Sequence, residues 1–475
     1  MEELEQNIKF KLLGYLLVST IGFSYLVFIR NAGISVPIFV IIQFMCLYFL
    51  MPRKKPLLLF IPIFILSLNS FISASTIWRA ANFFVTIALF SVMSLWAVGD
   101  FSIKGELLGF IYKTIGNSFK PFRHFRIPMK WLSEINKERS TTIRRVLMGV
   151  GASIPLLIII LIVLSAADEI FARSIDDFLW TVSNLVRMDA IFRIIVGMIA
   201  GFYLFGIIYI IYTYKAKYEV AIFEQPMNGD LIIINIVLGS ILIIYTLFVA
   251  IQFRYLFAAS GDLPFGLNYV EYARRGFFEL LFLSGLNITI ILVAIWLTKN
   301  QSNIGAKISK SLCSYLCVVT IILLISSFYR MSLYSSEFGL TRLRFLVFGF
   351  LIFEAIGLIF TQIYIIKPKF NILAIYSIIA LTYYLLLNVI SMDVFIARNQ
   401  VERYFRSGGN GIDYVLTLSA DAAGEISRLY DSDDYNTRQR VRNYYIRIDL
   451  DNDGWRQWNL ATARVGRYRR LTSEY

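Results

Sequence analysis

The sequence predicts an all-α polytopic membrane protein, and three observations carry that prediction: the composition, a series of long apolar runs and the placement of lysine. Of 475 residues, 57% are hydrophobic and only 16% are charged, a balance that suits lipid better than water. The apolar runs are about 17–23 residues long, which lets a helix cross a hydrocarbon layer of ~30 Å. We therefore expect a transmembrane helical bundle of about 11 spans with a small helical C-terminal domain.

The expected spans follow each other at short intervals along the chain. They are 12–29, 33–51, 57–73, 78–98, 146–166, 190–212, 231–253, 276–298, 311–329, 345–366 and 371–390. Pro62 and Asn69 interrupt the third, so it is the least regular of them. The chain then divides into a four-span segment (1–98), a basic loop (99–145), a seven-span core (146–390) and a C-terminal domain (391–475).

The lysines indicate the orientation. All sixteen, from Lys9 to Lys369, fall in gaps that one alternating topology puts on the same side. Lysine and arginine beside spans are retained in the cytoplasm, so this side is expected to be the inner one. The N-terminus is then inside and, with an odd number of spans, residues 391–475 lie outside. The loop charges also explain the net charge of +14, so we expect no nucleic-acid partner.

Few residues are suited to catalysis or metal binding. Cys46, Cys313 and Cys317 lie in apolar runs, which argues against a disulfide framework, and no second pair completes a metal site. His124 is the single histidine, so zinc chemistry and a Ser-His-Asp triad have little support. The first two outer loops carry no Asp or Glu, whereas multi-span glycosyltransferases use outer acid pairs. We expect no cofactor and favour a protein that is not an enzyme.

Two segments between the spans have an amphipathic pattern. In 99–145, basic residues alternate with Phe and Trp, which suits a helix on anionic inner-leaflet lipid. The alternative is that these charges only keep the loop in the cytoplasm. In 168–186, apolar residues recur at helical spacing opposite Asp and Arg, which predicts a packing helix at the outer interface.

The C-terminal segment 391–475 differs from the rest in composition, because it has thirteen arginines and no lysine. Helical periodicity appears at 394–406, 412–430, 437–448 and 455–472, interrupted by the sequences SGGNG and DSDD. These features predict a small all-helical outer domain that docks on the membrane part.

Glu354 lies near the middle of the tenth span, in the sequence FGFLIFEAIGLIF. A charge at that depth costs several kcal/mol unless it is paired or hydrated. One interpretation is a buried hydrogen bond or ion pair that fixes helix packing, and the other is a proton or cation relay or a cavity wall. Milder polar residues are expected to make interhelical hydrogen bonds. They are Asn82, Asn235, Asn287, Gln362 and Asn388.

Two outer segments, 252–281 and 328–345, are rich in arginine and acid. The candidate site residues are Arg254, Glu271, Arg274, Arg275, Arg330, Glu337, Thr341, Arg342 and Arg344. Guanidinium groups bind phosphate and carboxylate bidentately, so one interpretation is an anion pocket at the outer headgroup level. Its ligand would be an anionic lipid or an anionic envelope polymer. The alternative is intramolecular Arg–Glu pairing that holds the outer loops together.

A second acidic motif, Asp449-x-Asp451-x-Asp453-Gly454, lies between two predicted helices. Acids at positions one, three and five with glycine at six are typical of a calcium loop. The twelfth position, which normally supplies a bidentate Glu, is Leu460, so the sequence offers only a weak calcium candidate. The alternative is a turn that caps the following helix.

Several strings in the second half of the chain resemble a family of bacterial membrane proteins. They are GLNYVEYARRGFFELL, YRMSLYSSEFGLTRLR, DVFIARNQVERYF, DYVLTLSADA and WRQWNLATARVGR. The chain is similar over roughly 146–475 to the domain-of-unknown-function family DUF4173, which is related to DUF4153; Phe338 departs from the Tyr that is common there. The resemblance implies a multi-pass protein of the bacterial inner membrane without an established activity.

Three classes of function are consistent with these features. The favoured one is envelope-related transport, or binding of an anionic lipid or polymer at the outer face. A sensor or scaffold that acts through the outer C-terminal domain is the alternative. A membrane enzyme that acts on a lipid-linked substrate is the least favoured. Membrane lipids are the expected partners, and the sequence identifies no protein partner.

Overall fold

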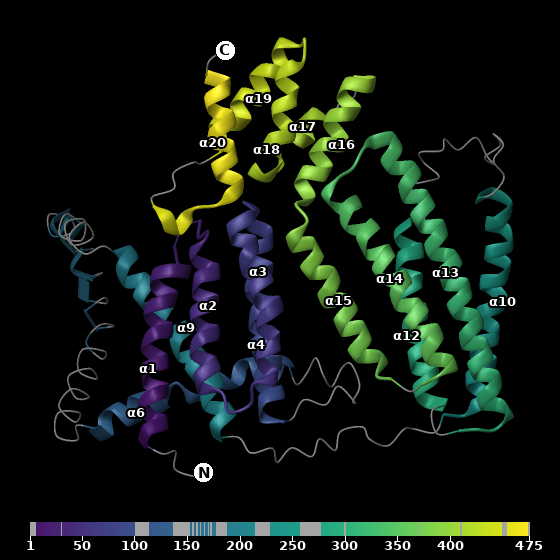
Figure 1. The fold of residues 1–475 in the computed structure, drawn as a ribbon, viewed down its shortest axis with the longest axis horizontal. Helices are drawn as coiled ribbons and strands as arrows, with labels where there is room; N and C mark the ends of the chain where they lie inside the picture. The colour runs from purple at the N-terminus through teal and green to yellow at the C-terminus, as the bar shows by residue number, and fades with distance from the viewer. Residues whose placement is uncertain are drawn as a thin grey trace.

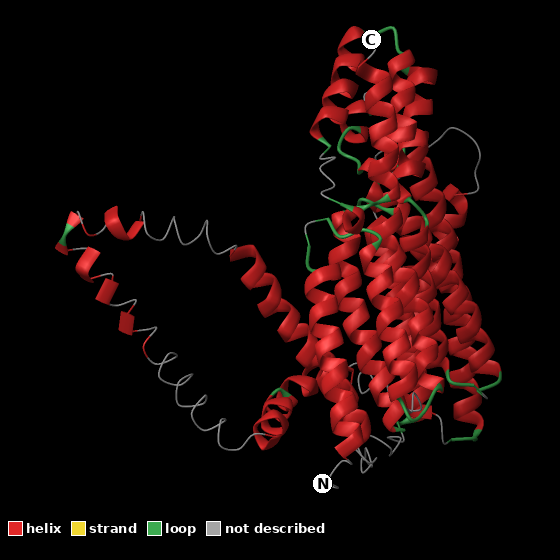
Figure 2. Ribbon diagram, turned by 60° about the vertical axis from the view of Figure 1, so that its left-hand side comes forward, coloured by secondary structure: helices red, strands yellow, loops and turns green. Residues whose placement is uncertain are grey.

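The structure is a computed structural model in which every regular element of the described residues is a helix (Figure 2). It describes residues 6–29, 31–99, 114–135, 188–213, 229–256, 277–298, 301–368, 370–408, 411–448 and 454–473, with parts of 153–176. The all-α prediction is thus confirmed for these ranges. Most of the expected span 146–166 and of the segment 168–186 lies outside them.

Nine helices among the described residues are long and apolar enough to cross a membrane. They are formed by α1 with η1 (Gln6–Gly22 and Phe23–Val27), η2 with α3 (Lys55–Leu59 and Phe60–Ile72), α4 (Thr76–Val98), α9 (Met188–Thr213), α10 (Leu231–Leu256), α12 (Phe277–Thr298), α13 (Ile304–Phe338), α14 (Arg342–Ile366) and α15 (Ile372–Val389). A further apolar helix, α2 (Ser35–Leu50), has only 16 residues. These ten helices correspond to ten of the expected spans, and the eleventh is 146–166.

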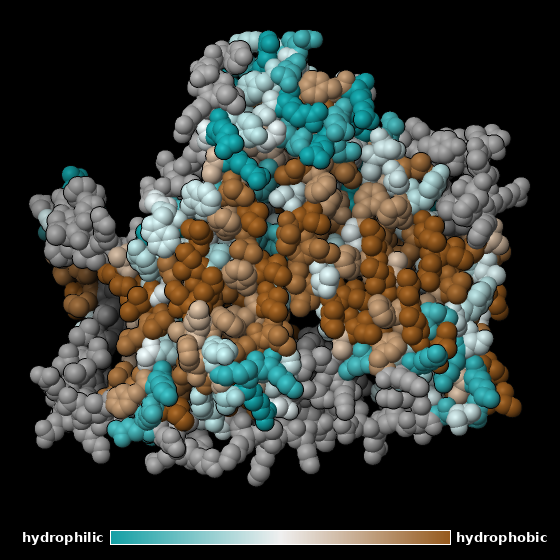
Figure 3. Space-filling view, viewed as in Figure 1, coloured by the Kyte–Doolittle hydropathy of each residue, from teal (hydrophilic) through white to brown (hydrophobic). Residues whose placement is uncertain are grey.

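Apolar side chains form a belt across the middle of the bundle, with hydrophilic residues above and below it (Figure 3). Helix α10 illustrates the belt, because Ile232, Ile236, Ile243 and Ile244 are 62–72% exposed. Large apolar side chains this exposed over a whole helix are stable against acyl chains rather than water. The chain is therefore a polytopic helical membrane protein, as the composition predicts.

The described spans alternate in direction along the chain, except that α4 and α9 both end at the same end of the bundle. One end of the bundle carries the N-terminus and the opposite end carries the C-terminal helices (Figure 1). We call these the lysine end and the tail end. The described lysines all lie at the lysine end. They are Lys9, Lys11, Lys54, Lys55, Lys120, Lys130, Lys307, Lys310 and Lys367.

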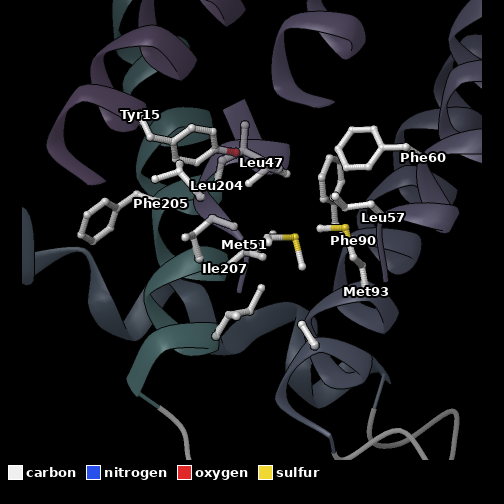
Figure 4. Close-up of a cluster of buried hydrophobic side chains, with 14 of the residues drawn as sticks. Tyr15, Leu47, Met51, Leu57, Phe60, Phe90, Met93, Leu204, Phe205 and Ile207 are labelled. Atoms are coloured by element: carbon white, nitrogen blue, oxygen red, sulfur yellow. The ribbon is translucent and has the colours of Figure 1, made fainter. Parts of the chain in front are cut away.

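Helices α1, α2, α3, α4 and α9 share one hydrophobic core and form the first half-bundle (Figure 4). Its centre includes Leu47, Met93 and Phe205, all at most 1% exposed. Gly197 and Gly201 of α9 let α1 approach closely: a Cβ on Gly201 would lie only 3.0 Å from the backbone nitrogen of Thr20. A pair of small residues four apart is a common device for close packing of membrane helices.

Helices α10, α12, α13 and α14 share a separate core and form the second half-bundle. Helix α13 has 35 residues and a length of about 52 Å, so it extends past a hydrocarbon layer of ~30 Å at the tail end. Much of the expected outer segment 328–345 is therefore helical, up to Phe338. Helix α15 joins the halves, because Tyr384 packs on the first core while the Tyr383 hydroxyl donates to Leu346 O of α14 at 2.6 Å.

The C-terminal helices form the tail, which we define as residues 392–448 and 454–473. Its elements are α16 (Met392–Ser407), α17 (Ile412–Val415), η5 (Ala420–Ala422), α18 (Ala423–Ile426), η6 (Ser427–Asp431), α19 (Tyr435–Arg447), η7 (Trp455–Gln457) and α20 (Leu460–Ser473). They enclose a core of their own, in which Ile396, Val441 and Tyr445 are fully buried. The predicted helix 412–430 is broken into short pieces, because the backbone at Ser419 turns away to donate to Asp393.

Candidate functional site

Glu354 lies in the middle of α14, about 18 Å from either end of a helix of 25 residues. Its side chain is buried, with 7% of the residue exposed. Neither carboxylate oxygen has a hydrogen-bond partner among the described residues. The described part of the chain also provides no Lys or Arg within ion-pair distance of it. An ionisable group in this state is unusual, because buried polar groups in membrane bundles are normally paired.

Two polar side chains that interact electrostatically with Glu354 already have hydrogen bonds to other groups. Ser284 of α12 interacts with the Glu354 carboxyl, but its hydroxyl donates to Leu281 O at 2.7 Å. Tyr376 of α15 also interacts electrostatically with Glu354, and its hydroxyl is hydrogen-bonded to the Thr361 hydroxyl at 2.8 Å. Both of these hydroxyl groups are therefore hydrogen-bonded to other oxygens.

The other polar residues predicted within the spans behave differently, because each makes an interhelical hydrogen bond. Asn287 accepts from the Tyr245 hydroxyl at 2.8 Å and donates to Thr320 at 3.0 Å. Asn82 donates to Asn388 at 2.7 Å. In the remaining pairs Ser309 donates to Asn235 at 2.6 Å, and Gln362 donates to Ser314. The prediction that hydrogen bonding explains these residues is confirmed, and it leaves Glu354 as the exception.

Arg342 pairs with an acid of the tail rather than with a loop glutamate. Its Nε and a terminal nitrogen donate to the two oxygens of Asp393 at 2.8 and 2.6 Å. Ser419 N also donates to Asp393, at 2.8 Å. Burial alone would raise the pKa of Asp393, but the hydrogen bonds from Arg342 and Ser419 hold it below the usual value. The pair thus fixes the tail to the start of α14.

Two more of the predicted anion-site residues, Arg344 and Thr341, hold the α13–α14 connection together. The Arg344 guanidinium lies over the Tyr334 ring at 4.2 Å and donates to Gly339 O. Thr341 caps α14 by accepting from Arg344 N. Gly339 has a φ of +73°, which a residue with a side chain would adopt only under strain.

The remaining predicted residues are not brought together by the described structure. Glu337 is exposed on α13, and Arg330 is buried with 8% exposure. Glu271, Arg274 and Arg275 lie outside the described residues, as does the side chain of Arg254. The outer anion pocket accordingly stays a prediction. The calcium candidate does too, since Asp449, Asp451 and Asp453 also lie outside the described residues.

Asp421 of the tail is a hydrogen-bonded carboxyl that the sequence did not single out. It accepts from the Ser73 hydroxyl at 2.6 Å, from Ala74 N at 3.1 Å and from the Ser419 hydroxyl at 3.0 Å. Burial raises its pKa, although these hydrogen bonds act in the opposite direction. The nearby Asn459 donates to Ser70 O and Ser73 O, both at 2.8 Å. These contacts anchor the tail to the α3–α4 connection.

The fold defines the class of protein: it is an integral membrane protein whose helical bundle carries a helical tail. Residues 17–429 match the model of a domain of unknown function, DUF4153, which is most of the chain. The protein belongs to that family. No curated protein and no solved structure matches the chain.

Proposed function

We propose that this protein is a membrane transporter in which Glu354 takes up and releases a proton during the transport cycle. The observation that carries the proposal is that both oxygens of this buried carboxyl lack a hydrogen-bond partner among the described residues. A carboxyl with a purely structural role would have a hydrogen-bond partner, as the side-chain amides of Asn82 and Asn287 do. An unpaired ionisable group in a span is a group that changes its state, through protonation or through hydration in another conformation.

We further propose that the protein lies in the inner membrane of a bacterium with its N-terminus in the cytoplasm and its tail outside. The described lysines at one end of the bundle support this orientation, because positive residues are retained on the cytoplasmic side. The strings EYARRGFFEL and FGLTRLR favour a placement near the related family DUF4173. In this orientation the outer arginines would meet envelope anions such as lipid headgroups.

A carbodiimide experiment tests the role of Glu354. Dicyclohexylcarbodiimide, which is apolar, modifies protonated carboxyl groups, and peptide mass spectrometry locates the adduct. We expect labelling of Glu354 that decreases as the pH is raised, and none at this peptide in Glu354→Gln. The exposed Glu337 is the internal reference, since a water-soluble carbodiimide should prefer it. Absence of labelling at Glu354 over the whole range from acidic to alkaline pH would contradict the proposal.

A second candidate function, engagement of an envelope component by the tail, is favoured by a hollow on the tail of about 870 Å³. Tyr404, Phe405 and several aspartates line it, including Asp431 and Asp433. This lining suits a cationic component rather than an anionic polymer. Replacing Asp431 and Asp433 by Asn should weaken such binding at low salt, and an unchanged affinity would remove this candidate.

A further inference from the structure

The described part of the basic loop, residues 114–135, forms a structure that we call the base segment. It comprises a helical stretch from 114, η3 (Lys120–His124) and α6 (Arg126–Ile135), and it lies at the lysine end of the bundle (Figure 1). The predicted helix in this loop is therefore present. Its fixed position gives its side chains a defined arrangement relative to the membrane surface.

One side of the base segment is anchored to three spans. Asn117 donates to Ser91 O of α4 at 3.1 Å. Pro121 packs so closely on α9 that a Cβ on Gly206 would lie 2.7 Å from its carbonyl oxygen. The buried Trp131 ring contacts Phe205 at 5.7 Å between centroids, and Lys9 of α1 lies 5.9 Å from that ring. The backbone is thus held on the bundle without help from its other side.

The other side is exposed and apolar. Exposed fractions range from 45 to 65% for Ile115, Phe119, Phe122, Met129 and Leu132. Burying such a side chain contributes on the order of 1.5–3 kcal/mol, so this set would be unfavourable in water. Because the base segment lies at an end of the apolar belt, the interface of the bilayer is the nearest medium that takes up these side chains.

The charges of the same segment are mainly positive. Residues 114–135 contain four Lys and Arg and one acid, Glu134. Arg123, Arg126 and Lys130 are exposed beside the apolar side chains. Basic residues at a bilayer surface each contribute about 1 kcal/mol of attraction to anionic headgroups. Apolar insertion combined with this charge selects an anionic leaflet over a neutral one.

We propose that the base segment binds anionic phospholipid, with Arg123 and Arg126 on the headgroup phosphates and the exposed apolar side chains among the acyl chains. The proposal is independent of the role of Glu354. It identifies the occupant by charge complementarity and by the place of the segment at the edge of the belt.

Native mass spectrometry of the full-length protein in neutral detergent tests the proposal, with phosphatidylglycerol and phosphatidylcholine added separately. We expect wild type to retain phosphatidylglycerol preferentially, and Arg123→Gln/Arg126→Gln to bind it about tenfold more weakly. Binding of phosphatidylcholine should not change. The matched control is Lys307→Gln/Lys310→Gln, which removes the same charge from exposed positions at the same end of the bundle.

The proposal is overturned if the double glutamine variant binds phosphatidylglycerol as wild type does, which would leave a protein partner as the occupant of this face. It is also overturned if the lysine control loses as much affinity, because net charge alone would then explain binding. Arg123→Lys/Arg126→Lys keeps the charge and should keep the binding. This variant preserves the test if the glutamine variant does not fold, and a loss of binding in the folded lysine variant would also count against the proposal.

Discussion

At the residue scale, Glu354 differs from the buried amides of the spans such as Asn287, because neither of its carboxylate oxygens has a hydrogen-bond partner among the described residues. Asn287 and Glu354 both lie in apolar surroundings of the second half-bundle, yet Asn287 has a donor and an acceptor in place. An asparagine with both groups satisfied specifies which helices meet. A carboxyl without a partner specifies nothing in this conformation and is costly when charged. Its presence is explained by a state in which it is protonated, hydrated or paired.

The residue contact with a clear pH dependence is the pair of Arg342 and Asp393. Because the pKa of Asp393 is lowered in the folded protein, its contribution to stability is present above the unfolded value of about 3.9. That contribution is lost as the pH falls through the lower folded pKa. Asp421 has a raised pKa, so its contribution to stability depends on pH in the opposite direction. That contribution is present at low pH and is lost as the pH rises through the folded pKa.

We therefore expect Asp393→Asn to destabilise the tail at neutral pH by about 1–2 kcal/mol, a reduced figure because the Arg342 side chain is 31% exposed. The difference from wild type should begin to shrink below about pH 4 and vanish as the pH falls through the lower folded pKa of Asp393, where wild type loses the same interaction. Thermal unfolding of the detergent-purified protein at both pH values measures it. Asp433→Asn, at an exposed position of the tail, is the control and should match wild type throughout. A difference that stays constant with pH would contradict this assignment.

At the element scale, the positions of the spans follow from local sequence, whereas their ends depend on contacts. Apolar runs determine where α10, α12 and α15 lie, because each must cover its backbone within the hydrocarbon layer. The extension of α13 to Phe338 carries no such signal, since its last turns are polar. The break after Val415 depends on Asp393, which is 26 residues away from Ser419 along the chain. Neither feature can be read from periodicity alone.

The packing of α1 on α9 gives a prediction for this scale. Gly201→Leu should destabilise the protein by about 1–3 kcal/mol, because a side chain there would overlap the backbone of Thr20. Gly239→Leu is the matched control, since a Cβ on Gly239 of α10 meets nothing within 4 Å. Thermal unfolding and the yield of monodisperse protein compare the two variants. Equal stability of both variants would show that α1 and α9 are not held together by this close approach.

At the scale of the whole molecule, the tail touches both half-bundles. Arg342 links it to α14, Asp421 links it to the α3–α4 connection, and Gly33 N donates to Arg456 O at the start of α2. The Asp421–Ser73 contact joins residues 348 positions apart in the chain. One sequence predicts a helical tail that docks on the membrane part, but it does not predict which residues meet. This is also why the acid that pairs with Arg342 was expected in the loops and is found in the tail.

The contacts of Asp421 and Arg342 lie on different half-bundles, so the loss of each should increase local unfolding in a different part of the chain. Asp421→Ala should raise amide hydrogen exchange in residues 70–79, while Arg342→Gln should raise it at 338–346 and at the start of α16. The core of α12 and α13 should stay protected in both, because its packing does not involve the tail. Exchange that rises throughout the chain in either variant would mean that the tail stabilises the fold as a whole. Exchange that rises only near the lost contact would instead show that the tail connects the two half-bundles. The tail and α15 are then the described elements that a movement of one half-bundle against the other would have to displace.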